Sequence, residues 1–148
     1  MPVRNEAPLL QGCLEDILSQ TLSEIEIVIV DDGSTDTTAE VLIEYSKRDP
    51  RIRIINTKHE GIISALNTGL DDCKGHYIAR MDADDRMDKT RLAKQLELMR
   101  SNPELDLIGC RIGGFTDSGR ITDSIEKYQS WSNSLISHQQ IECDLFAE

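Results

Sequence analysis

The sequence lacks the features that mark several classes of protein. Its four cysteines form no C-x-x-C pair, and their spacing fits no zinc-binding pattern. We therefore expect Cys13, Cys73, Cys110 and Cys143 to be buried thiols in a reducing compartment. No run approaches the roughly 18 apolar residues of a membrane-spanning helix, and the start of the chain has no apolar core of a secretory signal. These absences predict a cytoplasmic chain.

Basic residues are scarce relative to acidic ones. The chain has 16 Lys and Arg against 27 Asp and Glu, which gives a net charge of −11. Nucleic acid is therefore not expected as a partner, because binding its backbone needs a basic surface. A phosphate ligand remains compatible with this charge, because a divalent cation can bridge carboxylates and phosphates. With 148 residues, 39% of them hydrophobic, the chain is long enough for one globular domain.

Short strands and helices alternate over the first two-thirds of the sequence. Such alternation predicts an α/β fold, with a mostly parallel sheet that carries helices on both faces. Apolar spacing and turn residues place the expected helices at residues 9–18, from Thr37 to the break at Asp49-Pro50, at 61–73 and at 90–100. The expected strands are 25–30, 52–56, 77–81 and 105–110.

The pattern changes from Arg111 onward. Gly113-Gly114 and Ser118-Gly119 suggest turns or a hairpin, and a polar stretch with Trp131 leads to a helix around Ser134–Ile141. Both ends look cut, because only three residues stand where a full first strand is expected and no terminating signal precedes residue 148. We therefore expect an α/β core at residues 1–110 and an incomplete region at 111–148.

Two acidic clusters follow predicted strands. Asp31-Asp32 comes after strand 25–30, and the series from Asp82 to Asp85 comes after strand 77–81. Ligands of open α/β sheets bind outside the carboxyl ends of the strands, so both clusters are expected in one crevice. Asp31-Asp32 could equally form a turn and a helix cap. The second cluster is harder to explain without a cation, because its carboxylates repel one another.

A divalent cation suits the second cluster. Residues two apart in an extended chain point the same way, so Asp82 and Asp84 are expected to face one ligand while Asp85 turns elsewhere. Carboxylate oxygens in small number favour Mg²⁺ or Mn²⁺, which also bind phosphate oxygens.

Three other motifs fit the letters less well. A calcium hand would need an acidic residue and then glycine where Arg86 and Met87 stand. A phosphatase of the haloacid-dehalogenase type would need Thr or Val in place of Arg86, early in the chain. A response-regulator receiver would need an aspartate after strand 52–56, which instead runs into Asn56-Thr57-Lys58.

Two blocks of the sequence stand out, from Val30 to Asp36 (VDDGSTD) and at Asp82-Ala83-Asp84 (a D-x-D motif). Further blocks accompany them in order along the chain: Met1–Glu6, Ser19-Gln20-Thr21, Gly61-Ile62 with Ala65–Leu70, Gly75–Met81, Arg91-Leu92 and Gln95. Together, from residue 1 to about 110, these blocks resemble family-2 glycosyltransferases, which have the GT-A fold for nucleotide-diphospho-sugars. The first block is similar to the family signature and the second to its D-x-D motif.

The resemblance implies a glycosyltransferase that moves a sugar, with inversion, from a UDP-sugar or related donor to an acceptor hydroxyl, using Mn²⁺ or Mg²⁺. It implies that residues 1–110 bind the donor and that residues 111–148 begin the acceptor side. A saccharide or a lipid-linked saccharide, reached from the inner face of the membrane, is the expected acceptor. By the same resemblance the metal is bound by Asp84 and Asp82, and the nucleotide-sugar by Pro2, Arg4, Glu6, Asp32, Asn67 and Asp82.

No residue of the sequence is marked as the catalytic base, which in the family usually lies beyond the D-x-D motif. Carboxylates at Glu126, Glu142, Asp144 and Glu148 carry no recognisable motif, so the base is expected outside this chain. The histidines, His59, His76 and His138, are taken for surface or turn residues.

Two alternatives to this enzyme remain open. A binding or interaction module could keep the fold without the chemistry, and an exposed sheet edge would favour association with another chain, including a second copy of this one. A phosphotransfer or phosphatase domain of similar architecture is the other alternative.

Overall fold

The computed structural model describes residues 1–116 and 121–144, which divide into two units, Met1–Glu104 and Leu105–Glu148. The first unit contains a three-stranded sheet in the order β1-β2-β3, with β1 at Pro2–Val3, β2 at Ile27–Asp31 and β3 at Ile52–Asn56. Both strand pairs are parallel, and the register sets Pro2 opposite Val30 and Ile27 opposite Ile52. The α/β class and the parallel sheet expected from the sequence are therefore confirmed.

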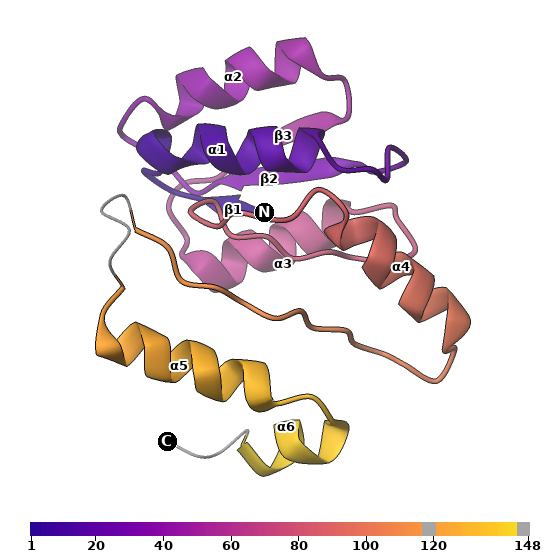
Figure 1. Cartoon of the computed structure of the whole chain (residues 1–148). Coiled ribbons are helices and arrows are strands. Elements are labelled where there is room, and N and C mark those ends of the chain that lie inside the picture. The colour runs from indigo at the N-terminus through magenta and orange to yellow at the C-terminus, as the bar shows by residue number, and fades with distance from the viewer. Residues whose placement is uncertain (117–120, 145–148) are drawn as a thin grey trace. The chain divides into compact units, whose positions relative to one another are not determined.

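Helices cover both faces of this sheet, as predicted. In Figure 1, α1 (Ala7–Leu18) and α2 (Thr38–Arg48) lie on one face, and α3 (Ile62–Asp72) lies on the other. Each helix follows one strand, so the chain leaves every strand end by a turn at the same edge of the sheet. The helix α4 (Arg91–Ser101) completes the first unit.

The core forms around β2, in which all five residues are buried. A central parallel strand is covered on both faces, which explains its unbroken β-branched run. On one face α1 contributes Leu10, Cys13, Leu14 and Ile17 to the apolar cluster. On the other face α3 approaches closely at Gly69, where an added Cβ would lie 3.3 Å from Cγ2 of Val30.

Two predicted strands are absent from the described residues. Residues 77–81 and 105–110 form neither strand nor helix, so these two predictions were wrong. Tyr77 and Ile78 are exposed, and Leu107 is 82% exposed. An extended segment becomes a strand only when a neighbour satisfies its backbone groups, and the sequence does not show which neighbour is available.

The second unit contains the helices α5 (Asp123–Ser134) and α6 (His138–Asp144). The helix predicted at Ser134–Ile141 was misplaced, because the chain leaves the helical conformation at Leu135 and Trp131 lies inside α5. Gly113-Gly114 belongs to an extended segment, whose neighbour Ile112 exchanges two 2.8 Å hydrogen bonds with the side-chain amide of Asn133. Ser118-Gly119 lies outside the described residues.

The four cysteines are free, as expected, but only Cys13 is buried. Cys73 is half-buried, and Cys110 and Cys143 are exposed, so the prediction of four buried thiols was wrong for these positions. No helix in the described part of the chain has the length and apolar character needed to span a membrane.

Candidate functional site

A cleft of about 420 Å³ opens in the first unit, at the carboxyl ends of the strands. Its walls are the turn after β1, the end of β2, the loop between β3 and α3, and the Asp82–Asp84 turn. Five of the six residues predicted to bind the nucleotide-sugar are among its lining residues, and so is Asp84. The lining residues are Pro2, Val3, Arg4, Glu6, Asp32, His59, Gly61, Ile62, Ala65, Asp82, Ala83 and Asp84.

The carboxylate of Asp32, at the end of β2, organises the loop after β3. One of its oxygens accepts from the Thr57 hydroxyl and from the Glu60 amide, both at 2.7 Å. The other accepts from the Gly61 amide at 2.9 Å and lies 3.2 Å from Nδ1 of His59. These hydrogen bonds, with that of Thr57 foremost, lower the pKa of Asp32 to about 2. Asp32 therefore stays ionised and ties two walls of the cleft together.

Gly33 lets the turn after β2 touch this same loop. Its φ is +69°, a conformation that side chains rarely adopt, and an added Cβ would lie 2.9 Å from the backbone nitrogen of His59. The glycine of the VDDGSTD block is therefore required by both the backbone conformation and the close approach.

The rest of the VDDGSTD block holds the turn between β1 and α1, which carries Arg4 and Glu6. The Ser34 hydroxyl accepts from the Asn5 amide at 3.0 Å, and the Asn5 side chain accepts from the Thr35 amide at 2.8 Å. Thr38, two residues past the block, accepts from the Glu6 amide at 3.0 Å. Asp31 accepts from the Ser34 amide, which fits the turn predicted for it, but neither Asp31 nor Asp32 caps a helix, since α2 begins after Thr37. Asp36 accepts from the Thr38 amide at 3.0 Å. The block therefore builds the cleft wall as well as lining it.

The D-x-D residues reach the cleft from a turn, not from an extended strand. The Ala83 side chain is buried in the core cluster, which leaves Asp82 and Asp84 on the cleft side. Asp82 forms an exposed ion pair with Arg80 at 3.1 Å. Within the described residues, the carboxylate of Asp84 has neither a hydrogen bond nor an ion pair. Asp84 is therefore the carboxylate most available to a ligand.

Negative charge is concentrated at this edge of the cleft. Burial, and then the charges of Asp84 and Asp36, raises the pKa of Glu6. Burial, followed by the charges of Asp84 and Asp82, also raises the pKa of Asp85. A cation bound by Asp84 would relieve this repulsion.

The donor set fits Mg²⁺ or Mn²⁺ held jointly with a phosphate ligand. Over residues 1–116 and 121–144, no three His, Cys, Asp or Glu side chains are placed to hold a metal ion by themselves. Ions of this type are commonly held by one or two carboxylates together with substrate phosphates. Asp84 and Asp82 could supply the protein's share.

The structure separates one predicted residue from the rest and adds others. Asn67 is exposed on α3 and is not among the lining residues. His59, assigned to the surface or a turn from the sequence, lies in the cleft wall with its side chain 54% exposed. Its position directly after a strand end was the signal that could have identified it, together with the neighbouring glycine, Gly61.

Comparison with known proteins places the chain in a family. The sequence profile described as "Glycosyl transferase family 2" matches residues 1–144. The chain belongs to this family. It is 39% identical to the uncharacterized glycosyltransferase EpsJ of Bacillus subtilis over 110 residues, which cover 74% of this chain and 32% of EpsJ. It is 37% identical to chondroitin synthase of Escherichia coli over 105 residues, covering 71% of this chain and 15% of the synthase.

Solved structures agree on the fold. TarS of S. aureus (residues 1–349) superposes with a TM-score of 0.64 at 21% identity, covering 78% of this chain and 38% of that chain. The mannosyltransferase PcManGT of Pyrobaculum calidifontis, in complex with GDP-Man and Mn²⁺, gives 0.62 at 29% identity over 66% of this chain and 30% of that chain. The GT-A fold expected from the sequence is confirmed. The chain spans about a third of the length of EpsJ, and a similar share of EpsH, another similar protein of Bacillus subtilis.

Proposed function

We propose that this chain binds a nucleoside-diphosphate sugar together with Mn²⁺ or Mg²⁺ and belongs to an enzyme that transfers the sugar to an acceptor hydroxyl. The observation that carries the proposal is the position of Asp84, which lines the cleft and has no side-chain hydrogen bond or ion pair over residues 1–116 and 121–144, while Asp32 orders the opposite wall. Family membership and the PcManGT complex with GDP-Man and Mn²⁺ support the same assignment.

The two walls of the cleft would take different parts of the donor. The turns after β1 and β2, with Pro2, Arg4 and Asp32, offer backbone groups, one cation and one ionised carboxylate to the nucleoside. Asp82 and Asp84 face the place where the diphosphate would lie, and they would hold the metal. A bound metal would neutralise the diphosphate and stabilise it as a leaving group.

Binding energy at such a site is most useful when it grows as charge develops on the leaving phosphate. Asp84 is available for this role because no other side chain or backbone group of the described residues binds its carboxylate. We propose a UDP-sugar as donor, inversion at the anomeric carbon, and a saccharide or lipid-linked saccharide as acceptor. We place the catalytic base outside the residues of this chain.

Calorimetry with UDP in the presence of Mn²⁺ tests the donor assignment, and GDP serves as the competing nucleotide. Wild type should release heat, and Asp84→Asn should bind at least about tenfold more weakly, the equivalent of about 1.4 kcal/mol. Asp85→Asn is the matched control, because Asp85 is the neighbouring exposed carboxylate and does not line the cleft. No heat from either nucleotide, or equal binding by Asp84→Asn and wild type, would overturn the proposal.

A second measurement separates an enzyme from a binding module. Metal-dependent release of UDP from UDP-sugars supports transfer chemistry, whereas binding without release supports a module that keeps the fold alone. Formation of a stable aspartyl phosphate from a small phosphodonor would instead favour the phosphotransfer alternative.

A further inference from the structure

The segment that carries the D-x-D turn, residues 80–92, belongs to the first unit but is not part of its sheet, so other contacts must hold it in place. It forms no strand, so no ladder of backbone hydrogen bonds fixes it. Met81 and Ala83 are buried, and the Cys13 thiol donates to the Asp82 carbonyl at 3.4 Å. These contacts hold the beginning of the segment. After Asp84, one backbone hydrogen bond, from the Thr21 amide to the Lys89 carbonyl at 2.8 Å, and the packing of Met87 on the core are supplemented by side-chain hydrogen bonds.

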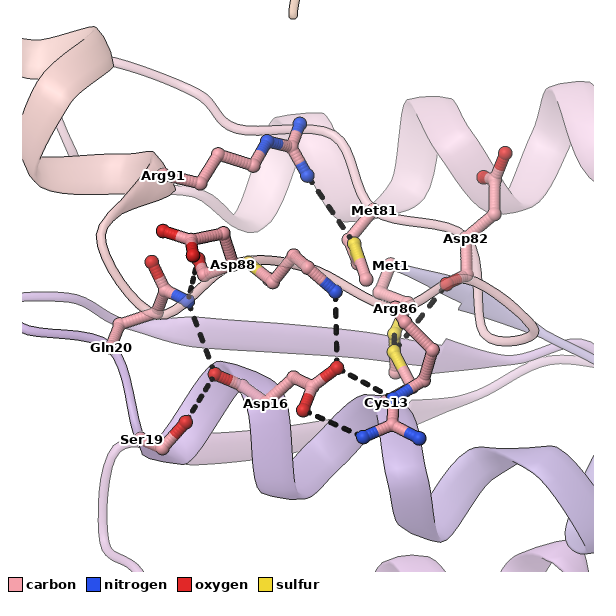
Figure 2. A network of polar contacts seen from close by, with 11 residues as sticks. Met1, Cys13, Asp16, Ser19, Gln20, Met81, Asp82, Arg86, Asp88 and Arg91 are labelled. Carbon is pink, nitrogen blue, oxygen red and sulfur yellow. Dashed lines mark hydrogen bonds and ion pairs between the residues drawn. The ribbon is translucent and has the colours of Figure 1, made fainter. Parts of the chain in front are cut away.

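Asp16, in the last turns of α1, holds the residues directly after the D-x-D turn. Its carboxylate accepts from Nε of Arg86 at 2.6 Å, from Nη2 of the same side chain at 2.9 Å and from the Met87 amide at 3.0 Å. Figure 2 shows the Arg86 side chain reaching across to this carboxylate. A two-bond contact between arginine and a carboxylate fixes orientation as well as distance.

Gln20 continues the same attachment further along the segment. Its side-chain amide is buried and donates to the Asp88 carbonyl at 2.9 Å and to the Asp16 carbonyl at 3.2 Å, as Figure 2 shows. Its oxygen accepts from the Leu92 amide at 3.1 Å. The stretch from Arg86 to Leu92 therefore follows the C-terminal end of α1. It is held by the side chains of Asp16 and Gln20 and by one backbone hydrogen bond, from the Thr21 amide to the Lys89 carbonyl at 2.8 Å.

The surface of α1 is shaped to accept Arg86. At Gly12, one turn before Asp16, an added Cβ would lie 3.1 Å from Nη1 and 3.3 Å from Cζ of Arg86. The guanidinium therefore lies directly over a glycine in the middle of a helix, a position where glycine costs about 0.5–1 kcal/mol relative to alanine. The close contact with the guanidinium explains why glycine, and not a larger residue, stands at position 12.

We propose that Asp16 is a positioning residue that fixes the Asp82–Asp84 turn in the cleft, by holding Arg86 and Met87 against α1. Asp84 is two residues from Arg86, so release of Arg86 lets the turn leave the orientation in which both aspartates face the cleft. The proposal rests on the metal and donor binding proposed above, and it concerns a residue that does not itself line the cleft.

Asp16→Ala tests the proposal, and Glu15→Ala is a closely matched control. Glu15 is the adjacent residue of the same helix, and its carboxylate also pairs with one arginine, Arg48 at 3.2 Å, and accepts one further hydrogen bond, from Tyr45. Each variant therefore loses a carboxylate, an ion pair and a second hydrogen bond. Of these two carboxylates, Asp16 contacts the D-x-D segment and Glu15 contacts α2.

Two measurements on the purified chain give the readout. In Asp16→Ala, hydrogen exchange should speed up in residues 80–92 and stay unchanged in β2 and β3. The same variant should bind UDP about tenfold more weakly in the presence of Mn²⁺, the lower end of what loss of an outer contact to a metal site costs. Glu15→Ala should match wild type in both measurements.

The outcomes separate this proposal from the one on which it rests. A wild type that binds neither UDP nor GDP with Mn²⁺ removes the donor assignment and the positioning role with it. A wild type that binds, beside an Asp16→Ala variant with equal affinity or unchanged exchange, overturns the positioning role alone. If Asp16→Ala does not fold, Arg86→Ala against Arg48→Ala provides the same comparison on exposed arginines.

Discussion

The contact between Gly33 and the loop after β3 predicts that alanine at this position costs more than strain alone. Two glycines in or beside the cleft have positive φ, Gly33 at +69° and Gly61 at +90°. At Gly33 a side chain should cost about 1–2 kcal/mol in the free energy of unfolding, because the positive φ crowds Cβ against the backbone. Gly61 combines its φ with a ψ of 165°, a conformation that almost only glycine adopts, so a side chain there should cost about 1–3 kcal/mol. No heavy atom lies within 4 Å of the Cβ added at Gly61, so the cost should end there.

At Gly33 a steric cost is added. The new Cβ would lie 2.9 Å from the His59 nitrogen and 3.2 Å from the His59 Cβ, and a backbone atom cannot move aside as a side chain does. Overpacking of this kind typically costs about 1–3 kcal/mol more. With about 4 °C of midpoint shift per kcal/mol for a chain of this size, Gly61→Ala should lower the melting temperature by about 4–12 °C and Gly33→Ala by about 8–20 °C.

Thermal unfolding of the two variants beside wild type, followed by circular dichroism, measures the difference. Urea titration at one temperature provides a second estimate that does not depend on the heat capacity of unfolding. A loss of less than about 2 kcal/mol for Gly33→Ala would refute the argument, because strain alone accounts for that much and the 2.9 Å approach would then carry no further cost.

Two further predictions follow from the pKa values of Asp32 and Cys13. Hydrogen bonds lower the folded-state pKa of Asp32 to about 2, so its ionised carboxylate stabilises the fold above the unfolded value near 3.8, and this stabilisation is lost as pH falls from there toward 2. The difference in urea midpoint between wild type and Asp32→Asn should therefore stay constant from pH 5 to 7 and shrink below about pH 4. A constant difference over the whole range would contradict this. Burial, followed by the charges of nearby aspartates, raises the pKa of Cys13 to about 12. Iodoacetamide at pH 8 should therefore modify the exposed Cys110 and Cys143 long before Cys13, which peptide mass spectrometry can measure. Rapid modification of Cys13 in the folded protein would contradict the raised pKa.

The strands that could be predicted are those whose own residues determine their burial. In β2, the run from Ile27 to Val30 is β-branched throughout and becomes the covered centre of the sheet, so its composition alone is informative. Residues 77–81 contain one β-branched residue and an arginine, and they pair with no strand. The strand β1 is two residues long, and its Pro2 has no amide hydrogen to donate, so its ladder is short. The availability of a partner is a property of the assembled sheet and not of the segment.

The sequence predicts which residues line the cleft better than it predicts the hydrogen bonds that hold them. The rule on strand ends correctly places Asp32 at the cleft, whereas Asp82 and Asp84 reach it from a turn that follows no strand. The sequence does not show that Asp32 accepts hydrogen bonds from Thr57, Glu60 and Gly61, because those bonds depend on the path of the loop that carries them. It also gives no sign that Asp16 contacts Arg86, since 70 residues separate them.

The two walls of the cleft are built by different kinds of contact, and mutations in them should differ accordingly. On the nucleoside side, Asp32 receives two backbone amides, and Gly33 touches backbone, so this wall is part of the folded core. Changes there should lower stability and ligand affinity together. On the wall proposed to hold the metal, Asp84 has no side-chain hydrogen bond or ion pair within the described residues. The segment behind it is held mainly by the side chains of Asp16 and Gln20, and Asp16, itself 18% exposed, pairs with an arginine that is 53% exposed. An ion pair with an exposed arginine contributes about 0–1 kcal/mol to global stability, so removal of Arg86 should lower metal-dependent affinity while the melting temperature stays nearly constant. A variant that loses both ligand affinity and melting temperature should therefore belong to the Asp32 wall, and one that loses affinity alone to the Asp84 wall. The same comparison applies to residues outside the cleft.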